Sequence, residues 1–417
     1  MNVYDSQLIA KFLIKNGFSS VNTPEDADII FINTCSVREH AETRAFGRIA
    51  SLNRLKIDNP NLKLFVVGCM AKRMEEKIWT KFPFVNFIVG PDNYRKIPDL
   101  LNDSITRGIF TTENNSEKYT GCIASNDRKV SSFIAVTRGC NNFCSYCIVP
   151  YLRGRERSRN HKDIIKEITL KAFEGVKEII LLGQNVNSYN YGVVNFAGLL
   201  KMVQTVPQIE RARFTTSHPK DVTDELLDII SSSDKICNHL HLPLQSGSNR
   251  ILSLMNRQYT REYYIKLVEK IREKLQSVAI TTDILVGFPT EKEEDFKATL
   301  DIIRRIRFDF AYMFRYSKRE GTRAAGLGDI PEKIKGERLK EVIALQNKIT
   351  KDKNSELVGK SVQVLVEAKS RRADEFYGKT KGNKAVVLSG NVQIGDIVNV
   401  KVSEIRGWTP YGEVVYE

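Results

Sequence analysis

The chain has 417 residues and a formal charge of +14, with 64 Lys and Arg against 50 Asp and Glu. This length predicts two or three domains, and the positive charge favours a polyanionic partner such as nucleic acid. The seven cysteines are irregularly spaced and the start does not resemble a leader peptide, so a secreted disulfide framework is not expected. The sequence contains no run of 18 apolar residues, so no transmembrane helix is predicted. We therefore expect a cytoplasmic protein without membrane contact.

The first hundred residues alternate between helical and strand patterns. Helices are predicted over residues 6–16 and 38–55, and strands over residues 28–32, 64–67 and 87–89. Apolar runs flanked by helices are typical of buried parallel strands. Residues 1–105 are therefore predicted to form a doubly wound α/β domain. The polar residues 106–129 are predicted to form a linker.

The middle of the chain repeats a strand-helix unit six times. Six parallel strands predict a partly closed (βα)6 barrel over residues 130–356, with its site at the carboxyl ends of the strands. A long helix from about residue 333 is expected to lead out of the barrel. The strands are expected near residues 133–136, 178–182, 213–216, 239–244, 280–286 and 310–316.

The last part, residues 357–417, changes to short alternating strands with glycine-containing turns. This pattern predicts a small antiparallel β-barrel of OB-like size. Its basic side chains could contact phosphates and its rings could stack on bases, although a merely solvated face is the alternative. The side chains concerned are Lys369, Arg371, Arg372, Lys379, Lys381, Lys384 and Arg406, with Tyr377, Trp408 and Tyr411.

Three closely spaced cysteines, Cys140, Cys144 and Cys147, follow the first predicted barrel strand. Thiolates are the ligands of iron-sulfur clusters, and three of them leave one iron of a 4Fe-4S cube open for S-adenosylmethionine. A structural zinc site or inert buried thiols are the alternatives. Zinc sites usually have four ligands in pairs, and no second cysteine pair follows here. The spacing therefore favours radical chemistry.

The run from Gly139 to Arg159 resembles that of the radical methylthiotransferases. The similarity covers nearly the whole chain and includes a C-terminal module similar to the TRAM domain. Five further runs resemble the MiaB branch, which acts on tRNA. They are residues 33–39 (NTCSVRE), 182–187 (LGQNVN), 215–219 (TTSHP), 242–248 (LPLQSGS) and 283–291 (DILVGFPTE).

The resemblance implies that a methylthio group is added to C2 of an isopentenylated adenosine beside the anticodon. It implies two S-adenosylmethionine molecules, one to methylate sulfur and one to form the radical that removes hydrogen. The alternatives are a branch that modifies a ribosomal-protein aspartate, a branch that acts on threonylcarbamoyladenosine in tRNA, and an RNA-binding iron-sulfur protein without turnover. The runs around Cys35 and Ser217 favour the isopentenyladenosine branch.

The resemblance also implies a second 4Fe-4S cluster in the α/β domain, with Cys35 and Cys69 as ligands. In the family a third ligand lies in a Gly-Cys-Gln sequence preceding the segment matched by residues 1–6. We expect that cysteine to be encoded upstream of Met1, with Cys122 as the alternative ligand. Cys237 is expected to be buried and inert.

Polar residues at the predicted strand ends are candidates for contacts to the cofactor or substrate. They are Gln184, Ser217, Gln245, Ser246 and the backbone around Gly287. Tyr146, inside the cysteine run, is a further candidate for a contact to the cofactor. Four alternating arginines, Arg153, Arg155, Arg157 and Arg159, could clamp tRNA phosphates, and a solvated basic loop is the alternative. The expected partners are the tRNA anticodon stem-loop and an electron donor such as flavodoxin or ferredoxin. We expect the protein to be a monomer.

Overall fold

The computed structural model describes residues 1–36, 39–124, 130–370 and 374–416, without the side chains of residues 39–40. The chain divides into two compact units, which we describe separately. The N-terminal unit comprises Met1–Asp127, Ala135–Phe143 and Cys147–Asp163. The C-terminal unit comprises Arg128–Ile134, Cys144–Tyr146 and Ile164–Glu417.

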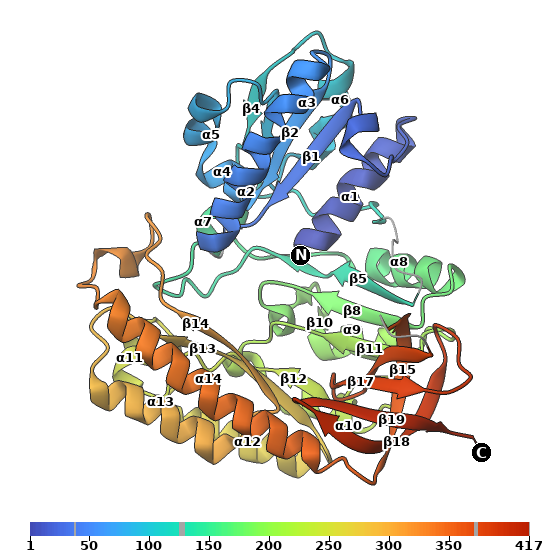
Figure 1. Cartoon of the computed structure of the whole chain (residues 1–417), viewed down its shortest axis with the longest axis vertical. Helices are drawn as coiled ribbons and strands as arrows, with labels where there is room; N and C mark the ends of the chain where they lie inside the picture. The colour runs from blue at the N-terminus through green and yellow to red at the C-terminus, as the bar shows by residue number, and fades with distance from the viewer. Residues whose placement is uncertain (37–38, 125–129, 371–373, 417) are drawn as a thin grey trace. The chain divides into compact units, whose positions relative to one another are not determined.

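The N-terminal unit is built on a parallel four-stranded sheet of order β1-β2-β3-β4 (Figure 1). Its strands are β1 (Ile29–Thr34), β2 (Lys63–Gly68), β3 (Phe87–Val89) and β4 (Gly108–Phe110). Side chains alternate between the two faces of a strand, and here both faces are buried. Phe65 and Val67 pack with α1 (Asn2–Lys15) and α6 (Ile97–Asn102), and Leu64 and Val66 pack against α2 (Glu39–Ser51) and α5 (Glu75–Lys81).

Strand β4 lies inside residues 106–129, where the sequence predicted a linker. It pairs with β3. Tyr119 and Cys122, which follow β4 in the chain, are buried in the same core as Phe65. The linker prediction is therefore wrong for these residues. The short helices α3 (Asn53–Asp58) and α4 (Cys69–Arg73) lie in the connections before and after β2.

The C-terminal unit contains the predicted partial barrel as two three-stranded sheets, β11-β8-β5 and β12-β13-β14. A parallel bridge between Ala212 and Ile236 links β11 to the segment that leads into β12. The neighbours β8 and β11, and likewise β12, β13 and β14, run parallel. The bounds are β5 (Ser131–Ala135), β8 (Glu178–Leu182), β11 (Arg211–Phe214), β12 (His239–His241), β13 (Ala279–Val286) and β14 (Phe310–Arg315).

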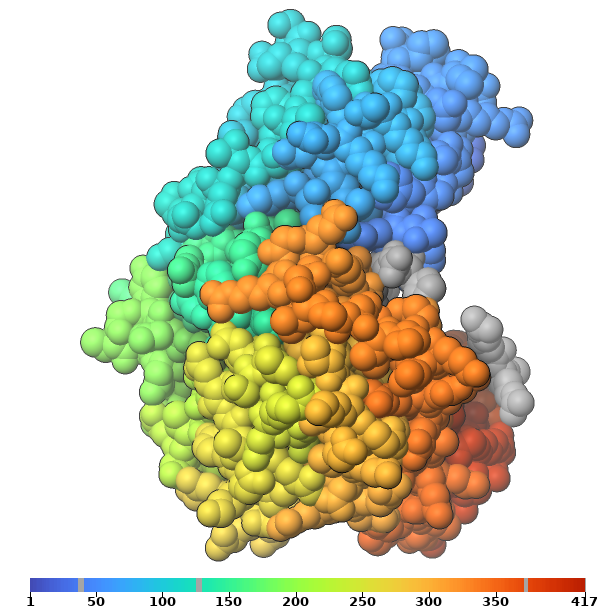
Figure 2. Space-filling view, turned by 90° about the vertical axis from the view of Figure 1, so that its left-hand side faces the viewer, coloured from blue at the N-terminus to red at the C-terminus, as the bar shows by residue number. Residues whose placement is uncertain are grey.

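Helices cover the outside of this partial barrel. Amphipathic sequences and side-chain caps define several of them; Thr223 and Thr260, for example, cap the helices that follow them. Figure 2 shows the yellow and orange residues of the later helices as a continuous outer layer. The helices are α8 (His161–Phe173), α9 (Phe196–Val203), α10 (Asp224–Ser231), α11 (Asn249–Leu254), α12 (Arg261–Lys274), α13 (Glu293–Ile306) and α14 (Glu332–Ser355).

The C-terminal module is a closed five-stranded barrel of order β15-β16-β17-β19-β18. Its core contains Val364, Val366, Val386 and Leu388. The predicted fold class is confirmed, except that β17 and β19 pair in parallel and not antiparallel. Within this module the sequence missed only β16. The strands are β15 (Ser361–Lys369), β16 (Glu375–Thr380), β17 (Ala385–Ser389), β18 (Ile397–Arg406) and β19 (Thr409–Val415). In the described part of the chain no helix is long and apolar enough to cross a membrane.

Candidate functional site

The cysteine loop begins at a glycine that no other residue could replace without strain. Gly139 has φ +77°, and an added Cβ would lie 2.1 Å from the carbonyl oxygen of Arg155. The next residue, Cys140, donates its N–H to the carbonyl oxygen of Gly154 at 3.2 Å. Helix α7 (Val149–Arg153) follows the loop. Glycine therefore lets the backbone fold closely against the segment after the loop.

The three cysteines of the loop are all partly exposed thiols. Cys140 and Cys147 belong to the N-terminal unit, and Cys144 belongs to the C-terminal unit. Among the described residues no three His, Cys, Asp or Glu side chains form a closed metal site. Cluster ligation by Cys140, Cys144 and Cys147 therefore stays a prediction.

Arg257 is a neighbour of Cys144 that the sequence analysis missed. Its guanidinium donates to the sulfur at 3.5 Å and to the Pro243 carbonyl oxygen at 2.9 Å, and it donates to the Tyr259 hydroxyl at 2.9 Å. Burial opposes the positive charge, but Tyr259, Tyr146 and Cys144 together hold the pKa of Arg257 well above its ordinary value. Cys144 therefore lies beside a buried cation that is held in place by its other hydrogen bonds.

Three residues in the loops that follow barrel strands have a strained backbone. Thr216, Gln245 and Thr290 have φ values of +68°, +69° and +66°, which non-glycine residues rarely adopt. Each of these residues belongs to one of the sequence runs that follow a strand. Such strain is concentrated at functional sites because the surrounding structure has to maintain it.

Two of the predicted contact residues carry a buried polar atom without a partner in the described structure. These atoms are the Oε1 of Gln184 and the hydroxyl oxygen of Ser217, whose side chain is only 2% exposed. Buried polar groups are normally hydrogen-bonded, so such atoms indicate a missing partner. Gln184 and Ser217 are therefore the best supported of the predicted ligand contacts.

The other predicted contact residues have mainly structural environments. The hydroxyl of Ser246 lies 3.4 Å from that of Thr299, and the backbone of Gln245 joins β13. Gly287 has φ +70°, and an added Cβ would lie 2.5 Å from Cγ of Lys335. Tyr146 packs against an apolar cluster that includes Met255 and Phe288. Ligand contacts by these four residues stay predictions.

Cys35 and Cys69 directly follow paired residues of neighbouring strands. Thr34 of β1 pairs with Gly68 of β2, so both cysteines lie at the same edge of the sheet. Burial raises the pKa of the Cys69 thiol, whereas Arg153 opposes this effect by donating to the sulfur at 3.2 Å. This edge therefore brings two thiols and a fixed cation into one region of the sheet.

A buried carboxylate holds that cation in place. Asp5 is fully buried, and its oxygens accept from Arg138 at 2.6 Å and from Arg153 at 2.7 Å. The guanidinium of Arg138 also lies over the ring of Tyr119, 4.4 Å from its centroid. Burial opposes ionisation, but the two arginines hold the pKa of Asp5 below its ordinary value.

The four alternating arginines do not form the predicted phosphate clamp. Arg153 binds Asp5, Arg157 pairs with Asp92 at 3.0 Å, and Arg159 donates to the Tyr4 hydroxyl at 3.0 Å. All three are buried, because their partners are buried with them. Arg155 alone is exposed, with its guanidinium 4.4 Å from the ring centroid of Phe143.

The remaining cysteines are buried. Cys122 is 6% exposed within the apolar core of the N-terminal unit, and Cys237 is 1% exposed. Burial raises the pKa of both thiols. The expected burial of Cys237 is confirmed. Of the predicted RNA contacts, Lys369 is exposed, whereas Arg371 and Arg372 lie outside the described residues.

Three family models match the chain, in the order of its three predicted parts. The uncharacterized protein family UPF0004 matches residues 1–90, the Radical SAM superfamily residues 134–303, and the TRAM domain residues 355–415. Together they cover most of the sequence.

Several relatives are similar over the full length of the chain, and each is named tRNA-2-methylthio-N(6)-dimethylallyladenosine synthase. The protein of Thermoanaerobacter pseudethanolicus is 46% identical, over 100% of this chain and 90% of the relative. That of Thermodesulfovibrio yellowstonii is 44% identical, over 100% and 96%. That of Clostridium novyi is 45% identical, over 100% and 94%.

Solved structures share the fold at low sequence identity. The radical S-adenosylmethionine methyltransferase TsrM from Kitasatospora setae, solved with cobalamin and a [4Fe-4S] cluster, has a TM-score of 0.59 at 14% identity. That match covers 77% of this chain and 74% of TsrM. The cobalamin-dependent radical enzyme OxsB has a TM-score of 0.51 at 14% identity, over 82% and 49%.

Proposed function

The chain belongs to the radical S-adenosylmethionine methylthiotransferases named tRNA-2-methylthio-N(6)-dimethylallyladenosine synthase, and we propose that it adds a methylthio group to C2 of the dimethylallylated adenosine in tRNA. The full-length similarity to these relatives carries the proposal. Their names favour this branch over the ribosomal-protein and threonylcarbamoyladenosine branches. The domain borders at residues 129 and 356 are part of the same proposal.

Membership of the radical family implies a 4Fe-4S cluster and S-adenosylmethionine. We propose that Cys140, Cys144 and Cys147 hold this cluster; when bound, it supplies the electron that cleaves S-adenosylmethionine into methionine and a carbon radical. The contact from Arg257 supports the role of Cys144, because a cation 3.5 Å from the sulfur would offset the negative charge of a cluster held there.

For cofactor and substrate binding we propose residues at the carboxyl ends of the barrel strands. Gln184 and Ser217 would use their unpartnered polar atoms for hydrogen bonds to a ligand. Gln245, Ser246 and Gly287 would shape the wall beside it. Tyr146 would pack against the cofactor from within its apolar cluster.

We propose a second cluster at the sheet edge formed by Cys35 and Cys69. Arg153 fits this proposal, because it places positive charge 3.2 Å from Cys69 and is itself held by Asp5. Arg153 would therefore act as a positioning residue for the second ligand set. Cys122 lies within an apolar core, which makes it a poorer candidate for this ligand set.

The TRAM domain and the relatives' names support tRNA as the substrate. For phosphate contacts we propose the exposed residues Arg155 and Lys369, with Arg371 and Arg372 beside Lys369 in sequence. We further propose a cytoplasmic monomer that receives electrons from a flavodoxin or ferredoxin.

The proposal is tested by anaerobic incubation of the iron-reconstituted protein with reductant, S-adenosylmethionine and unmodified or dimethylallylated tRNA. Mass spectrometry of the nucleosides should find the 2-methylthio product only with dimethylallylated tRNA. Cys144→Ala should abolish both this product and 5′-deoxyadenosine. If a preparation that carries both clusters forms 5′-deoxyadenosine but no tRNA nucleoside gains a methylthio group, another substrate branch is correct.

A further inference from the structure

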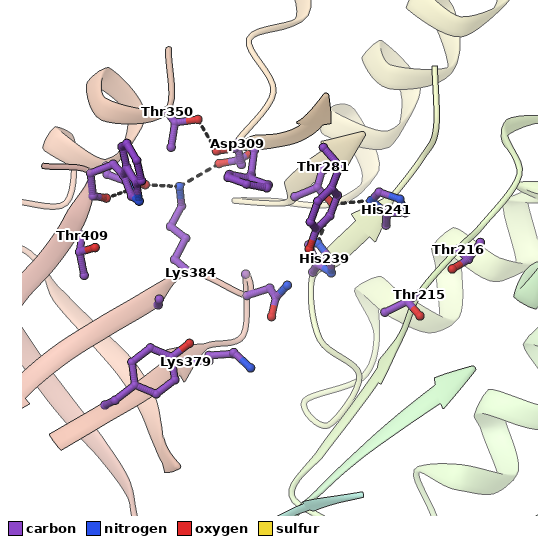
Figure 3. A pocket seen from close by; sticks show the side chains of 18 residues that line it. Thr215, Thr216, His239, His241, Thr281, Asp309, Thr350, Lys379, Lys384 and Thr409 are labelled. Atoms are coloured by element: carbon purple, nitrogen blue, oxygen red, sulfur yellow. Dashed lines mark hydrogen bonds and ion pairs between the residues drawn. The ribbon is translucent and has the colours of Figure 1, made fainter. Parts of the chain in front are cut away.

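A pocket of about 670 Å³ lies in the C-terminal unit, between strands β12, β13 and β14 of the partial barrel and the TRAM domain (Figure 3). This volume is within the range of about 300–1,000 Å³ that is typical of small-ligand sites. One wall consists of side chains from β12, β13 and β14, and the other of TRAM residues such as Lys384 and Trp408. No role has been given to it so far.

The register of strands β12, β13 and β14 places the barrel side chains of this pocket on one face of their sheet. Thr281 pairs with His241 on one side and with Phe310 on the other, so these three side chains form a row across the sheet. Successive side chains of a strand alternate, so Tyr312 lies on the same face as Phe310. The intervening Ala311 is fully buried. Strand β14 therefore presents its aromatic side chains to the pocket.

The rings on this face are exposed although they are large and apolar. Phe310 is 40% exposed, Tyr312 is 48% exposed, and Trp408 on the opposite wall is 55% exposed. The ring centroids of Phe310 and Tyr312 lie 5.1 Å apart, and those of Tyr312 and His241 lie 5.8 Å apart. A connected row of half-exposed rings is typical of a surface that stacks on a flat ligand.

The charged side chains of the pocket are already paired. Lys384 lies 3.1 Å from Asp309, and a dashed line in Figure 3 marks this ion pair. Lys384 also donates to the Asn354 side chain at 2.7 Å. Lys379 pairs with Glu367 at 3.1 Å. Because these cations are neutralised, phosphate is a poor match for the pocket, and a neutral aromatic ligand is a better one.

Neutral hydrogen-bonding groups complete the pocket. Thr281 bridges His239 at 2.9 Å and His241 at 3.0 Å through its hydroxyl. His239 is 2% exposed, and its Nδ1 has no partner in the described structure. Burial lowers the pKa of His239 well below its ordinary value, so this ring is neutral at physiological pH. A neutral imidazole can donate or accept at Nδ1, which suits the edge of a nucleobase.

We propose that this pocket binds one unstacked base of the tRNA loop that neighbours the target adenosine, stacked on Tyr312 and Phe310. The inference rests on the proposed tRNA substrate and adds a second point of recognition. Single-stranded RNA is usually recognised through splayed bases on aromatic side chains. Binding a neighbouring base here would hold the loop open, so that the target base is unstacked before it reacts.

The test compares the affinity of the holoenzyme for an anticodon stem-loop RNA between wild type and three variants. Tyr312→Ala should weaken binding by about 5- to 150-fold, the cost of one lost stacking interaction. Tyr312→Phe should restore affinity, because it keeps the ring. Phe173→Ala is the matched control, since Phe173 is a 73% exposed ring outside the pocket and its loss should leave affinity unchanged. The salt dependence of binding should not change in any variant, since no phosphate contact is removed.

A photoactivatable base placed at each loop position in turn gives an independent measurement on the unmutated protein. One position beside the target adenosine should crosslink to the peptide that contains residues 308–315. Unchanged affinity of Tyr312→Ala, or crosslinks only outside the pocket, would overturn the inference. Free adenosine that competes as well as the stem-loop would also overturn it, in favour of a small-nucleoside site. If the wild type neither binds nor modifies tRNA, the proposed function fails instead.

Discussion

Replacing the buried carboxylate of the N-terminal unit is expected to destabilise that unit strongly. Asp5→Asn keeps the shape of the side chain but removes the charge that pairs with Arg138 and Arg153. Both guanidinium groups are at least 90% buried and would remain charged. Removing one partner of a buried ion pair costs about 3–5 kcal/mol, so we expect a loss of this size in the free energy of unfolding.

The unfolding of this unit can be followed by its single tryptophan. Trp79 lies in α5, and the other tryptophan, Trp408, lies in the C-terminal unit. In a Trp408→Phe background, urea unfolding of the cluster-free protein monitored by fluorescence therefore reports Trp79 alone. Asp58→Asn is the matched control, since Asp58 is 65% exposed and 4.0 Å from Arg54. Exposed pairs contribute little, so this control should unfold at the same urea concentration as its parent.

The pH dependence of the Asp5 effect has a definite sign. The folded-state pKa of Asp5 is lowered from an ordinary value of 3.8, so its ionised form stabilises the fold above that pH. The contribution is lost as the pH falls through the folded-state pKa. The difference between wild type and Asp5→Asn should therefore be constant above about pH 5 and shrink at lower pH. A difference that is small at pH 7, or that grows on acidification, would refute the argument.

Two further substitutions test the environment of the cysteine loop and of the barrel. Arg257→Gln should lower the iron content of the loop cluster and the rate of 5′-deoxyadenosine formation, whereas Arg257→Lys should keep part of both. Iron analysis and chromatography measure these effects. Wild-type values for Arg257→Gln would exclude a role of Arg257 in supporting Cys144. Gly287→Ala should destabilise the C-terminal unit by at least about 1–2 kcal/mol, because Gly287 has φ +70° and faces the buried Lys335. Thermal unfolding measures this loss, and a stable Gly287→Ala protein would contradict the described backbone.

Most of the architecture could be predicted from the sequence because local patterns dictate it. The apolar run at residues 64–67 forms a strand buried on both faces, as such runs usually do. Strands β4 and β16 were missed, because three residues are too few for periodicity and the EFYGKT sequence of β16 does not alternate. Their place in the fold is set by the neighbours with which they pair.

The functional side chains were predicted less well wherever their partners lie far away in the sequence. Arg153 and Arg157 look like a solvated basic loop, and their burial depends on Asp5 and Asp92, which are 148 and 65 residues away. Arg257 was missed because Cys144 is 113 residues away. Sequence spacing identifies the cysteine ligands within one loop, but it carries no information on long-range charge pairs.

The central claim is that this chain removes hydrogen from C2 of a tRNA adenosine and replaces it with a methylthio group. The most direct test uses an anticodon stem-loop with deuterium at C2 of the dimethylallylated adenosine, incubated anaerobically with the reconstituted protein. The deuterium should appear in 5′-deoxyadenosine, together with a 2-methylthio nucleoside in the RNA. Deuterium that remains in the RNA while 5′-deoxyadenosine forms without it would contradict the claim.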